Sequence, residues 1–267
     1  MVADVSSFIP SLQPSVTVER HRYIHVIGAS VFVSDRVEID DAEHHFLGVH
    51  VSEGGSEAVW AVDVPHGEDP SDGAAIDLFT YFGRSTEEEW AIAGRAVQLA
   101  EWARTHKFCG RCGAATMRSD NDRSMKCPSC NLLAYPRIAP AMITLVTRGE
   151  GADSEALLAR GVSFRAPMYS CLAGFVEPGE SLEQSVIREV REEVGVQIDV
   201  PSYVSSQPWP FPHSLMLGFQ ARWLSGEIVC DPTEIVDAQW YRRDQLPNIP
   251  PRISIARKLI DMWVADV

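Results

Sequence analysis

The sequence has no long hydrophobic run. Its longest predominantly apolar stretch covers residues 138–146, which is too short to cross a bilayer. The first residues, Met1 to Ser6, contain neither the basic segment nor the apolar segment of a secretory signal. We therefore expect a soluble, cytoplasmic protein with no membrane contact.

Positive charge and cysteine are both scarce. The chain has 23 Lys and Arg against 37 Asp and Glu, a formal net charge of −14, which opposes non-specific binding to nucleic acid. Only six of the 267 residues are Cys, and in an intracellular chain they indicate metal or thiol chemistry and argue against a disulfide framework. Hydrophobic residues make up 45% of the chain, enough for a globular protein with a buried core.

Four of the cysteines form two C-x2-C pairs. Cys109 and Cys112 make the first pair, and Cys127 and Cys130 follow after fourteen residues. Two such pairs can close a tetrahedral thiolate site around one Zn²⁺, and four protein ligands leave the ion no open position. We therefore expect a structural zinc ribbon. A redox use of either pair is the alternative, disfavoured because neither pair opens a βαβ pattern.

The regions on either side of the ribbon differ in pattern. Residues up to about 84 are β-rich and carry no chemical motif, and a helix should follow, with Thr86 and Glu89 as its capping box. After the ribbon, strand and helix patterns alternate, which favours an α/β/α sandwich around a mixed sheet. We predict three domains: a β-rich domain ending in a linking helix (1–105), the ribbon (106–135) and the α/β domain (136–267).

A helix rich in carboxylates is predicted within the α/β domain. Ser181 and Gln184 form a capping box at its start, and Gly195 is a natural stop. At 100° per residue, one face is apolar (Val186, Ile187, Val190 and Val194) and the adjacent face is acidic (Glu189, Glu192 and Glu193). Carboxylates this close repel one another unless a divalent cation binds between them. The alternative is a solvated face on which Arg188 and Glu192 form an ordinary ion pair.

The spacing of this loop and helix resembles a known motif. Gly174, Glu180 and the run from Arg188 to Val196 match the Nudix box at every fixed position. Downstream, residues 206–214 read SQPWPFPHS; taken alone this is a rigid Pro-rich loop or a polyproline ligand, but it is similar to the array of the NADH pyrophosphatase branch of that family. With the ribbon and the N-terminal region, the resemblance covers most of the chain. It implies a Nudix α/β/α sandwich with a mixed sheet, preceded by a β-rich N-terminal domain and a zinc ribbon.

The resemblance also implies an activity. Proteins of this branch hydrolyse the pyrophosphate bond of NADH or NAD⁺ to nicotinamide mononucleotide and AMP, and they remove the NAD cap from RNA 5′ ends. They are homodimers that use Mg²⁺ or Mn²⁺ for catalysis and hold one structural Zn²⁺ per chain. Two alternatives remain: a Nudix hydrolase of another nucleoside diphosphate derivative, such as ADP-ribose or an ADP-sugar, and a binding module whose ribbon holds RNA or protein while the box is inactive.

Matching the box position by position implies the catalytic and metal-binding residues. The catalytic residues would be Glu193, Glu192 and Arg188, with Glu193 or Glu192 as the general base and Glu193 favoured. The ligands of the catalytic metal would be the Ala173 carbonyl and the side chains of Glu189, Glu193 and Glu234.

The same matching implies the substrate-binding residues. Phe175 would stack on a base of the substrate, and Tyr135 would reach the site from the partner subunit. Ala256 would also touch the ligand. The nicotinamide-nucleotide pocket would be lined by Gln207, Pro208, Trp209, Pro210, Phe211, Pro212, His213 and Ser214.

The ribbon region is locally basic. Between residues 101 and 140 there are seven basic residues and three acidic ones, and seven minus three gives +4 on a chain of −14. The basic residues are Arg104, Lys107, Arg111, Arg118, Arg123, Lys126 and Arg137, and the acidic ones are Glu101, Asp120 and Asp122. We expect this local basic surface to hold the first phosphates of a capped RNA, so that reversing Arg118, Arg123 and Lys126 to Glu slows its decapping. The alternatives are a merely solvated ribbon surface, or a charge that the thiolates of the zinc site offset.

Overall fold

The computed structural model describes residues 7–14, 18–37, 39, 42–52, 54–164 and 167–266. The chain divides into two compact units, Met1–Arg137 and Ile138–Val267. Within the described ranges, no helix combines the length and the apolar character that a membrane crossing needs.

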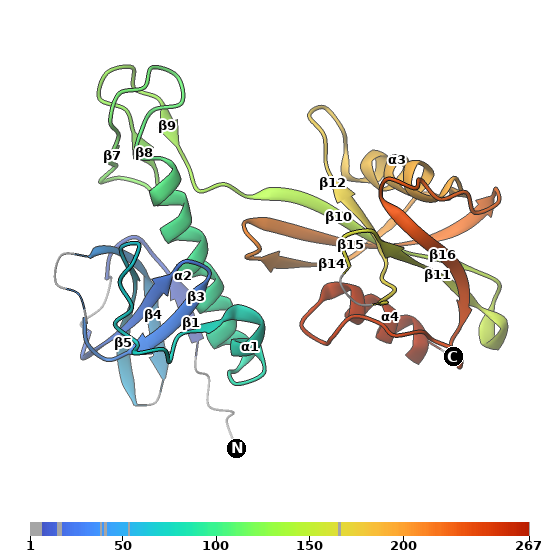
Figure 1. The fold of residues 1–267 in the computed structure, drawn as a ribbon, viewed down its shortest axis with the longest axis horizontal. Coiled ribbons are helices and arrows are strands. Elements are labelled where there is room, and N and C mark those ends of the chain that lie inside the picture. Colours follow the sequence, from blue (N-terminus) through green and yellow to red (C-terminus); the bar gives the residue numbers. More distant parts are fainter. Residues whose placement is uncertain are drawn as a thin grey trace. The chain divides into compact units, whose positions relative to one another are not determined.

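The first unit contains a six-stranded sheet with the order β1-β4-β5-β2-β3-β6. Strands β2 and β5 are parallel, and the other neighbours are antiparallel. A short helix, α1 (Leu78–Phe82), and a long helix, α2 (Glu87–Thr105), follow the sheet (Figure 1). The strands are β1 (Ser7–Pro10), β2 (Arg20–Ile27), β3 (Ser30–Ser34), β4 (Glu43–Ser52), β5 (Gly55–Asp63) and β6 (Ile76–Asp77).

Helix α2 begins as predicted and leads into the ribbon. Thr86 and Glu89 form the reciprocal capping box, so two of the free N–H groups at the helix start are satisfied. In Figure 1 the chain passes from the end of α2 into a three-stranded sheet. Its strands, in the order β7-β8-β9, are β7 (Met117–Arg118), β8 (Met125–Lys126) and β9 (Leu133–Ala134).

The second unit is built on a seven-stranded mixed sheet with the main order β13-β15-β10-β11-β16. Strand β12 pairs with β10, strand β14 pairs with β15, and the central pair β10 and β15 is parallel. The strands are β10 (Ala139–Arg148), β11 (Glu155–Gly161), β12 (Leu172–Phe175), β13 (Gln197–Ile198), β14 (Ser202–Trp209), β15 (Ser214–Ser225) and β16 (Ile235–Arg242), with a 3₁₀ turn at Gly151–Asp153.

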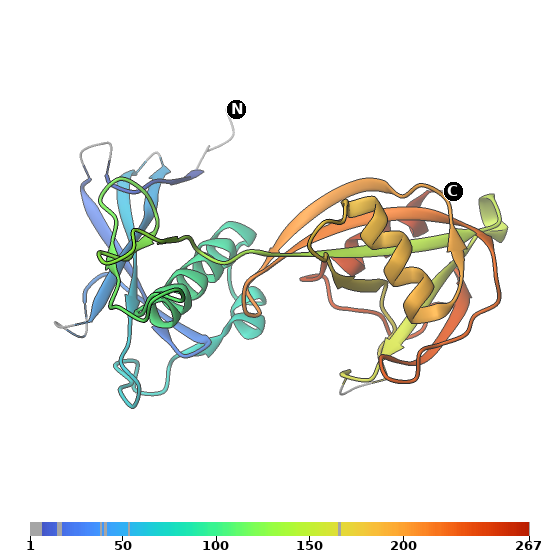
Figure 2. The same ribbon diagram turned by 90° about the horizontal axis from the view of Figure 1, so that it is seen from above.

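Two helices cover opposite faces of this sheet (Figures 1 and 2). Side chains alternate along β10, so Met142 and Val146 pack against α3 (Leu182–Val194), whereas Ile143 and Leu145 pack against α4 (Ile255–Ala265). The predicted α/β/α sandwich is therefore confirmed.

The predicted apolar face of α3 was wrong in one residue. Val186, Val190 and Val194 are fully buried at i, i+4 and i+8, but Ile187 is 40% exposed. Successive helical residues are 100° apart, so Ile187 lies outside the narrow stripe that its three valine neighbours define. Burial also extends to Glu189 and Glu193, which makes the second buried stripe of the helix acidic.

The two units share a sheet order. In the first unit β4-β5-β2-β3-β6 repeats the order β14-β15-β10-β11-β16 of the second, with a parallel central pair and a helix after the last strand in both. They differ in one connection. Only residues 35–42 link β3 to β4, whereas the matching connection from β11 to β14 contains α3. These eight residues are fewer than the 13 of α3, so the connection is too short for a counterpart of the whole carboxylate helix.

Candidate active site

The loop before α3 is held in one conformation by local hydrogen bonds. The Glu177 N–H donates to the Glu180 carboxylate (3.1 Å), and the Glu180 N–H donates to the Glu177 carbonyl (3.2 Å). Gly179 takes a φ of 93°, which favours glycine. Ser181 and Gln184 then cap the helix reciprocally, as predicted, and Gly195 ends it in the left-handed region.

Arg188 organises the acidic side chains around it. Its Nε and Nη2 donate to the two oxygens of Glu180 (2.5 and 3.0 Å), and its Nη1 donates to Glu189 and Glu192 (both 2.9 Å). A further bond runs from Nη2 to the Phe175 carbonyl (3.0 Å). These charge-assisted bonds fix the helix against the end of β12 and orient the carboxylate of Glu189.

Three carboxylates converge beside this network. Glu189, Glu193 and Glu234 each have an oxygen within 4.8 Å of the others. Glu189 and Glu193 are only 9% and 6% exposed. Among the described residues, the buried Glu193 Oε2 has no hydrogen-bond partner. An unpartnered buried carboxylate oxygen beside two further carboxylates is stable only if protonated or bound to a cation.

The pKa shifts have matching causes. Burial, with the charges of Glu189 and Glu234, raises the pKa of Glu193 to about 8. Burial also raises the pKa of Glu189. In contrast, the hydrogen bonds from Arg188 lower the pKa of Glu180 to about 2, so this carboxylate stays ionised and holds the arginine. The cluster is an all-oxygen donor set, which fits a hard divalent cation such as Mg²⁺ or Mn²⁺.

Glu234 reaches the cluster because its loop is fastened to the end of α3. The Val229 N–H donates to the Val194 carbonyl and the Asp231 N–H donates to the Glu193 carbonyl (both 2.9 Å). The Asp231 side chain then accepts from the N–H and the hydroxyl of Thr233 (2.8 and 2.7 Å). The next residue, Glu234, is thereby directed at the helix.

A cleft of about 320 Å³ opens beside Glu193 and Glu234. Sequence reasoning missed three of the side chains that line it, Ser163, Phe164 and Thr233. The first two follow β11 in a segment without a motif, so no sequence signal marks them. An Asp-x-Thr turn at residues 231–233 was the available signal for the third.

The structure distinguishes the two candidate bases by environment. The side chain of Glu192 is 59% exposed and bonds to Arg188 (2.9 Å). Glu193 is buried within the carboxylate cluster. Ala173, whose carbonyl was expected among the metal ligands, lies on β12 and lines the same cleft as Glu193.

The Pro-aromatic stretch forms the end of a hairpin and is not a free loop. Residues up to Trp209 belong to β14, and Trp209 pairs with Ser214 of β15. The rings of Trp209 and Phe211 meet edge to face with centroids 5.0 Å apart. The Gln207 amide is engaged by backbone at the start of α4, donating to the Ile253 carbonyl (2.7 Å) and accepting from the Ile255 N–H (2.8 Å).

The remaining predicted ligand contacts lie in different surroundings. Phe175 is 59% exposed at the end of β12, and Ala256 is buried in the core under α4. Tyr135 belongs to the first unit, where it is 54% exposed and its hydroxyl donates to the Asp122 carboxylate (2.9 Å).

Gly174 is required by the carboxylate packed against it. A Cβ at this position would overlap the carboxyl group of Glu189, which Arg188 holds in place. We expect Gly174→Ala to displace Glu189 and weaken Mn²⁺ binding by about tenfold or more, as loss of a supporting group does at metal sites. Titration of Mn²⁺ by electron paramagnetic resonance measures this. Gly161→Ala is the control, because its Cβ would meet nothing closer than 3.8 Å. Equal Mn²⁺ affinity in both variants would contradict the explanation.

The four ribbon cysteines come together as two similar turns. In the first, the Gly113 N–H donates to the Cys109 carbonyl (2.9 Å), and in the second the Asn131 N–H donates to the Cys127 carbonyl (2.9 Å). Gly113 and Asn131 both have left-handed φ values, 75° and 59°. The two cysteine pairs are therefore presented in the same way.

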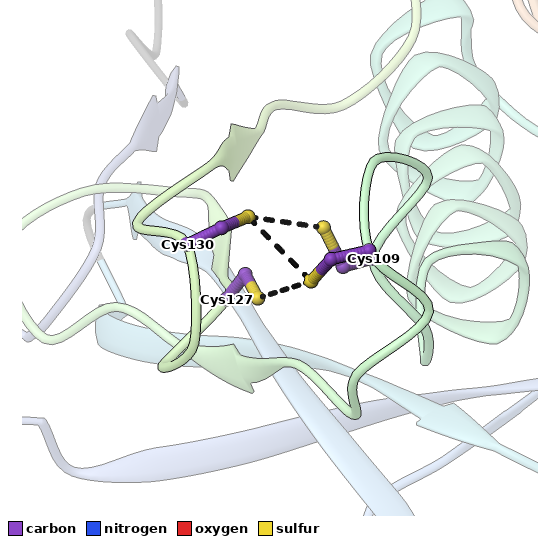
Figure 3. Close-up of side chains that lie close together, drawn as sticks. Cys109, Cys127 and Cys130 are labelled. Atoms are coloured by element: carbon purple, nitrogen blue, oxygen red, sulfur yellow. Dashed lines mark hydrogen bonds between the residues drawn. The ribbon is translucent and has the colours of Figure 1, made fainter.

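The sulfur separations fit a tetrahedral zinc site. Sγ atoms lie 3.6 Å apart for Cys109 and Cys130, 3.5 Å for Cys112 and Cys127, and 3.6 Å for Cys112 and Cys130 (Figure 3). Zn–S bonds of about 2.3 Å in a tetrahedron require about 3.8 Å between sulfurs. Backbone N–H groups of Cys112 and Arg111 lower the pKa of Cys109 to about 6, whereas hydrogen bonds with the Cys127 and Cys130 thiols outweigh the Ala114 N–H and raise the pKa of Cys112 to about 12.

Two arginines of the expected basic RNA surface, Arg118 and Arg123, form hydrogen bonds within the first unit. Arg118 donates to the His44 carbonyl (2.5 Å) and to Glu43 (2.7 Å), and Arg123 donates to the carbonyls of Phe46 and Ser11 (3.0 and 2.8 Å). Strand β1 pairs with β4 only from residue 48 onward, so carbonyls of the earlier part of β4 need other donors. The two arginines supply them and fasten the ribbon to the sheet of the first unit.

Three family models match consecutive parts of the chain. The NADH pyrophosphatase-like rudimentary NUDIX domain matches residues 19–102, the NADH pyrophosphatase zinc ribbon domain matches residues 104–135, and the NUDIX domain matches residues 137–262. Among solved structures, a NUDIX hydrolase from Nitrosomonas europaea is similar, with a TM-score of 0.51 and 18% identity, covering 60% of this chain and 91% of that one. That likeness supports the fold alone.

Two relatives are similar in sequence. The NAD-capped RNA hydrolase NudC of Pseudomonas aeruginosa (strain LESB58) is 54% identical over 178 residues, 67% of this chain and 63% of that protein. The NAD-capped RNA hydrolase NudC of Deinococcus radiodurans is 46% identical over 201 residues, 75% of this chain and 72% of that protein. The match thus spans somewhat less than two thirds of the Pseudomonas protein and more than two thirds of the Deinococcus one.

The sandwich with its carboxylate loop and helix defines a Nudix domain. A zinc ribbon and a rudimentary domain precede it, and with this domain order the chain belongs to the NADH pyrophosphatase branch of the Nudix hydrolases.

Proposed function

We propose that this protein hydrolyses the pyrophosphate bond of NADH and NAD⁺ to nicotinamide mononucleotide and AMP, and removes the NAD cap from RNA 5′ ends. The observation that carries the proposal is the buried cluster of Glu189, Glu193 and Glu234, with the unpartnered Glu193 Oε2 among them. Such a cluster repels a diphosphate unless cations lie between the two. The relatives named NAD-capped RNA hydrolases support the choice of substrate.

The carboxylates would hold Mg²⁺ or Mn²⁺. When bound, the divalent ion neutralises the diphosphate and makes a water molecule more acidic. Glu193 takes the proton of the attacking water, whose oxygen forms a bond to one phosphorus while the bond from that phosphorus to the bridging oxygen breaks. Arg188 keeps Glu189 oriented through its 2.9 Å bond, and Glu192 shares the arginine from the exposed side. Two phosphate monoesters leave.

The direct test measures AMP release from NADH with and without Mn²⁺. We expect turnover that needs Mn²⁺ or Mg²⁺ and that is faster on NADH than on ADP-ribose or ADP-glucose. Preferential hydrolysis of either ADP derivative would identify a Nudix hydrolase of another substrate. A lack of metal-dependent turnover on all three would leave only a binding role.

The proposal includes a homodimer with one structural Zn²⁺ per chain. The four clustered thiols support the zinc stoichiometry, and the exposed Tyr135 supports a role for that residue outside its own unit. Light scattering for the mass and elemental analysis for the zinc test the two statements separately.

The Pro-framed aromatics would supply a rigid slot for the nicotinamide end of the substrate. We expect Trp209→Ala to lower kcat/KM for NADH by roughly tenfold. The kcat/KM for ADP-ribose, which lacks nicotinamide, should change by less than about threefold. The edge-to-face pair with Phe211 is the physical basis, because it holds both rings in place. Tyr203→Ala, an exposed aromatic earlier on β14, is the control. Equal losses on the two substrates would assign the stretch a structural role only.

A further inference from the structure

One face of the ribbon sheet points away from the sheet of the first unit. Strand pairing places Met117, Lys126 and Leu133 side by side across β7, β8 and β9. The opposite face holds the buried Met125 and the start of Arg118, whose guanidinium reaches the β4 carbonyls. Since neighbours alternate sides in a strand, the first three residues share the other face.

One aromatic residue extends this face. Phe108 pairs with Ala115, two residues before Met117. We call this set the outer ribbon face, made of Phe108, Ala115, Met117, Lys126 and Leu133. Phe108 is 69% exposed, Met117 57% and Leu133 40%, so the first unit itself leaves large apolar side chains uncovered.

The charges around this face are positive. Lys126 stands at its centre, Lys107 precedes Phe108, and Arg111 lies in the first cysteine turn; all three are exposed, and none forms an ion pair with the residues that the structure describes. The region 106–137 contains only two acids, Asp120 and Asp122. Flat aromatic surfaces interleaved with free cations are the features that bind single-stranded nucleic acid, because bases stack and phosphates attract cations.

We propose that the outer ribbon face binds the RNA strand that follows the NAD cap, with a base stacked on Phe108 and a phosphate held by Lys126. This inference rests on the proposed removal of NAD caps from RNA. It explains how a chain with a net charge of −14 accepts a polyanion, since binding is confined to a locally basic surface. The phosphate is thereby assigned to Lys126 and not to Arg118 or Arg123, which donate to carbonyls of β4.

The binding test uses a 3′-labelled NAD-capped 20-nucleotide RNA and fluorescence anisotropy. Full-length Glu193→Gln protein is the background, so that the cap stays intact. We expect Phe108→Ala to raise Kd by about 5–50-fold, the effect of losing one stacked base. Lys126→Glu should also raise Kd and should lower the slope of log K against log salt by about one. Lys258→Glu, with the same charge change on an exposed position of α4, is the control and should leave both quantities unchanged.

Turnover and mass complete the test. In the otherwise unmodified enzyme, Phe108→Ala and Lys126→Glu should lower kcat/KM for NAD-capped RNA and leave that for free NADH within twofold. Unchanged RNA affinity, or equal losses on both substrates, overturns the inference. So does a halved mass by light scattering in either variant, which would make a second copy of the chain the occupant of this face. If the wild type hydrolyses neither substrate, the proposed function fails, while the anisotropy result still decides whether the face binds RNA.

Discussion

Glu193→Gln should abolish most turnover while leaving the fold intact. The substitution keeps the shape of the side chain but removes the only group in the cluster with a buried, unpartnered oxygen among the described residues. Loss of a general base lowers kcat by about 10²–10⁴-fold. Steady-state rates on NADH at saturating Mn²⁺ measure the effect, and circular dichroism checks the fold.

Glu192→Gln is the matched control for this prediction. Its side chain is 59% exposed and, among the described residues, its carboxylate bonds to Arg188, so we expect a loss smaller than about tenfold. If Glu192→Gln is the more damaging change, the roles of the two residues are exchanged.

Glu193→Gln should also stabilise the metal-free protein at alkaline pH. The pKa of Glu193 is raised to about 8 from an ordinary 4.5, so the folded state binds this proton more tightly than the unfolded state. Stability from this group is therefore present at low pH and is lost as the pH rises through 8. Glu193→Gln has no such proton to lose. Its melting temperature without metal should exceed that of the wild type at pH 9, with the difference closing toward pH 5. A constant difference across this range would mean that Glu193 does not titrate as described.

Helix periodicity predicted the two carboxylates on α3 but not the third, Glu234. The spacing of Glu189 and Glu193 places them one turn apart on one face, and capping residues fixed the helix ends correctly. Glu234 comes from a distant loop, and its approach depends on backbone bonds from Val229 and Asp231 to the end of α3. No local pattern encodes such bonds, so only the resemblance to the Nudix family could suggest that residue.

Charge counting could not distinguish basic residues with tertiary contacts from those without them. The count of +4 in the ribbon region is correct, but it treats all seven basic residues alike. Arg118 and Arg123 donate hydrogen bonds to carbonyls of β4. These carbonyls have no partner in β1, because β1 pairs with β4 only from Gly48 onward. The register of an edge strand is a property of the whole sheet, and sequence does not give it. Strand order also depends on the whole sheet, so the sequence patterns did not reveal that the two units share one.

Removal of zinc should unfold the ribbon and weaken the sheet beside it. Zn²⁺ binding to four thiolates contributes on the order of 10 kcal/mol to the folding of small zinc domains, so Cys112→Ser should remove bound zinc and lower the melting temperature of the first unit by about 10 °C or more. The sandwich of the second unit has its own core, and its transition should stay in place. Differential scanning calorimetry resolves the two transitions, and elemental analysis measures zinc. Cys230→Ser, outside the ribbon, is the control. Wild-type protein without zinc would refute the assignment.

A second variant distinguishes the stabilising effect of zinc from that of the hydrogen bonds between the ribbon and the sheet of the first unit. Arg123→Met keeps all four cysteines but leaves the carbonyls of Phe46 and Ser11 without their donors, in a site where burial lowers the pKa of Arg123 to about 10. Each buried carbonyl left unsatisfied costs about 1–3 kcal/mol. This variant should therefore retain stoichiometric zinc and still lower the melting temperature of the first unit. Lys126→Met, on the outer ribbon face, changes charge equally without touching β4 and should melt like the wild type. If Arg123→Met also melts like the wild type, the zinc stabilises only the ribbon, and the ribbon does not stabilise the sheet.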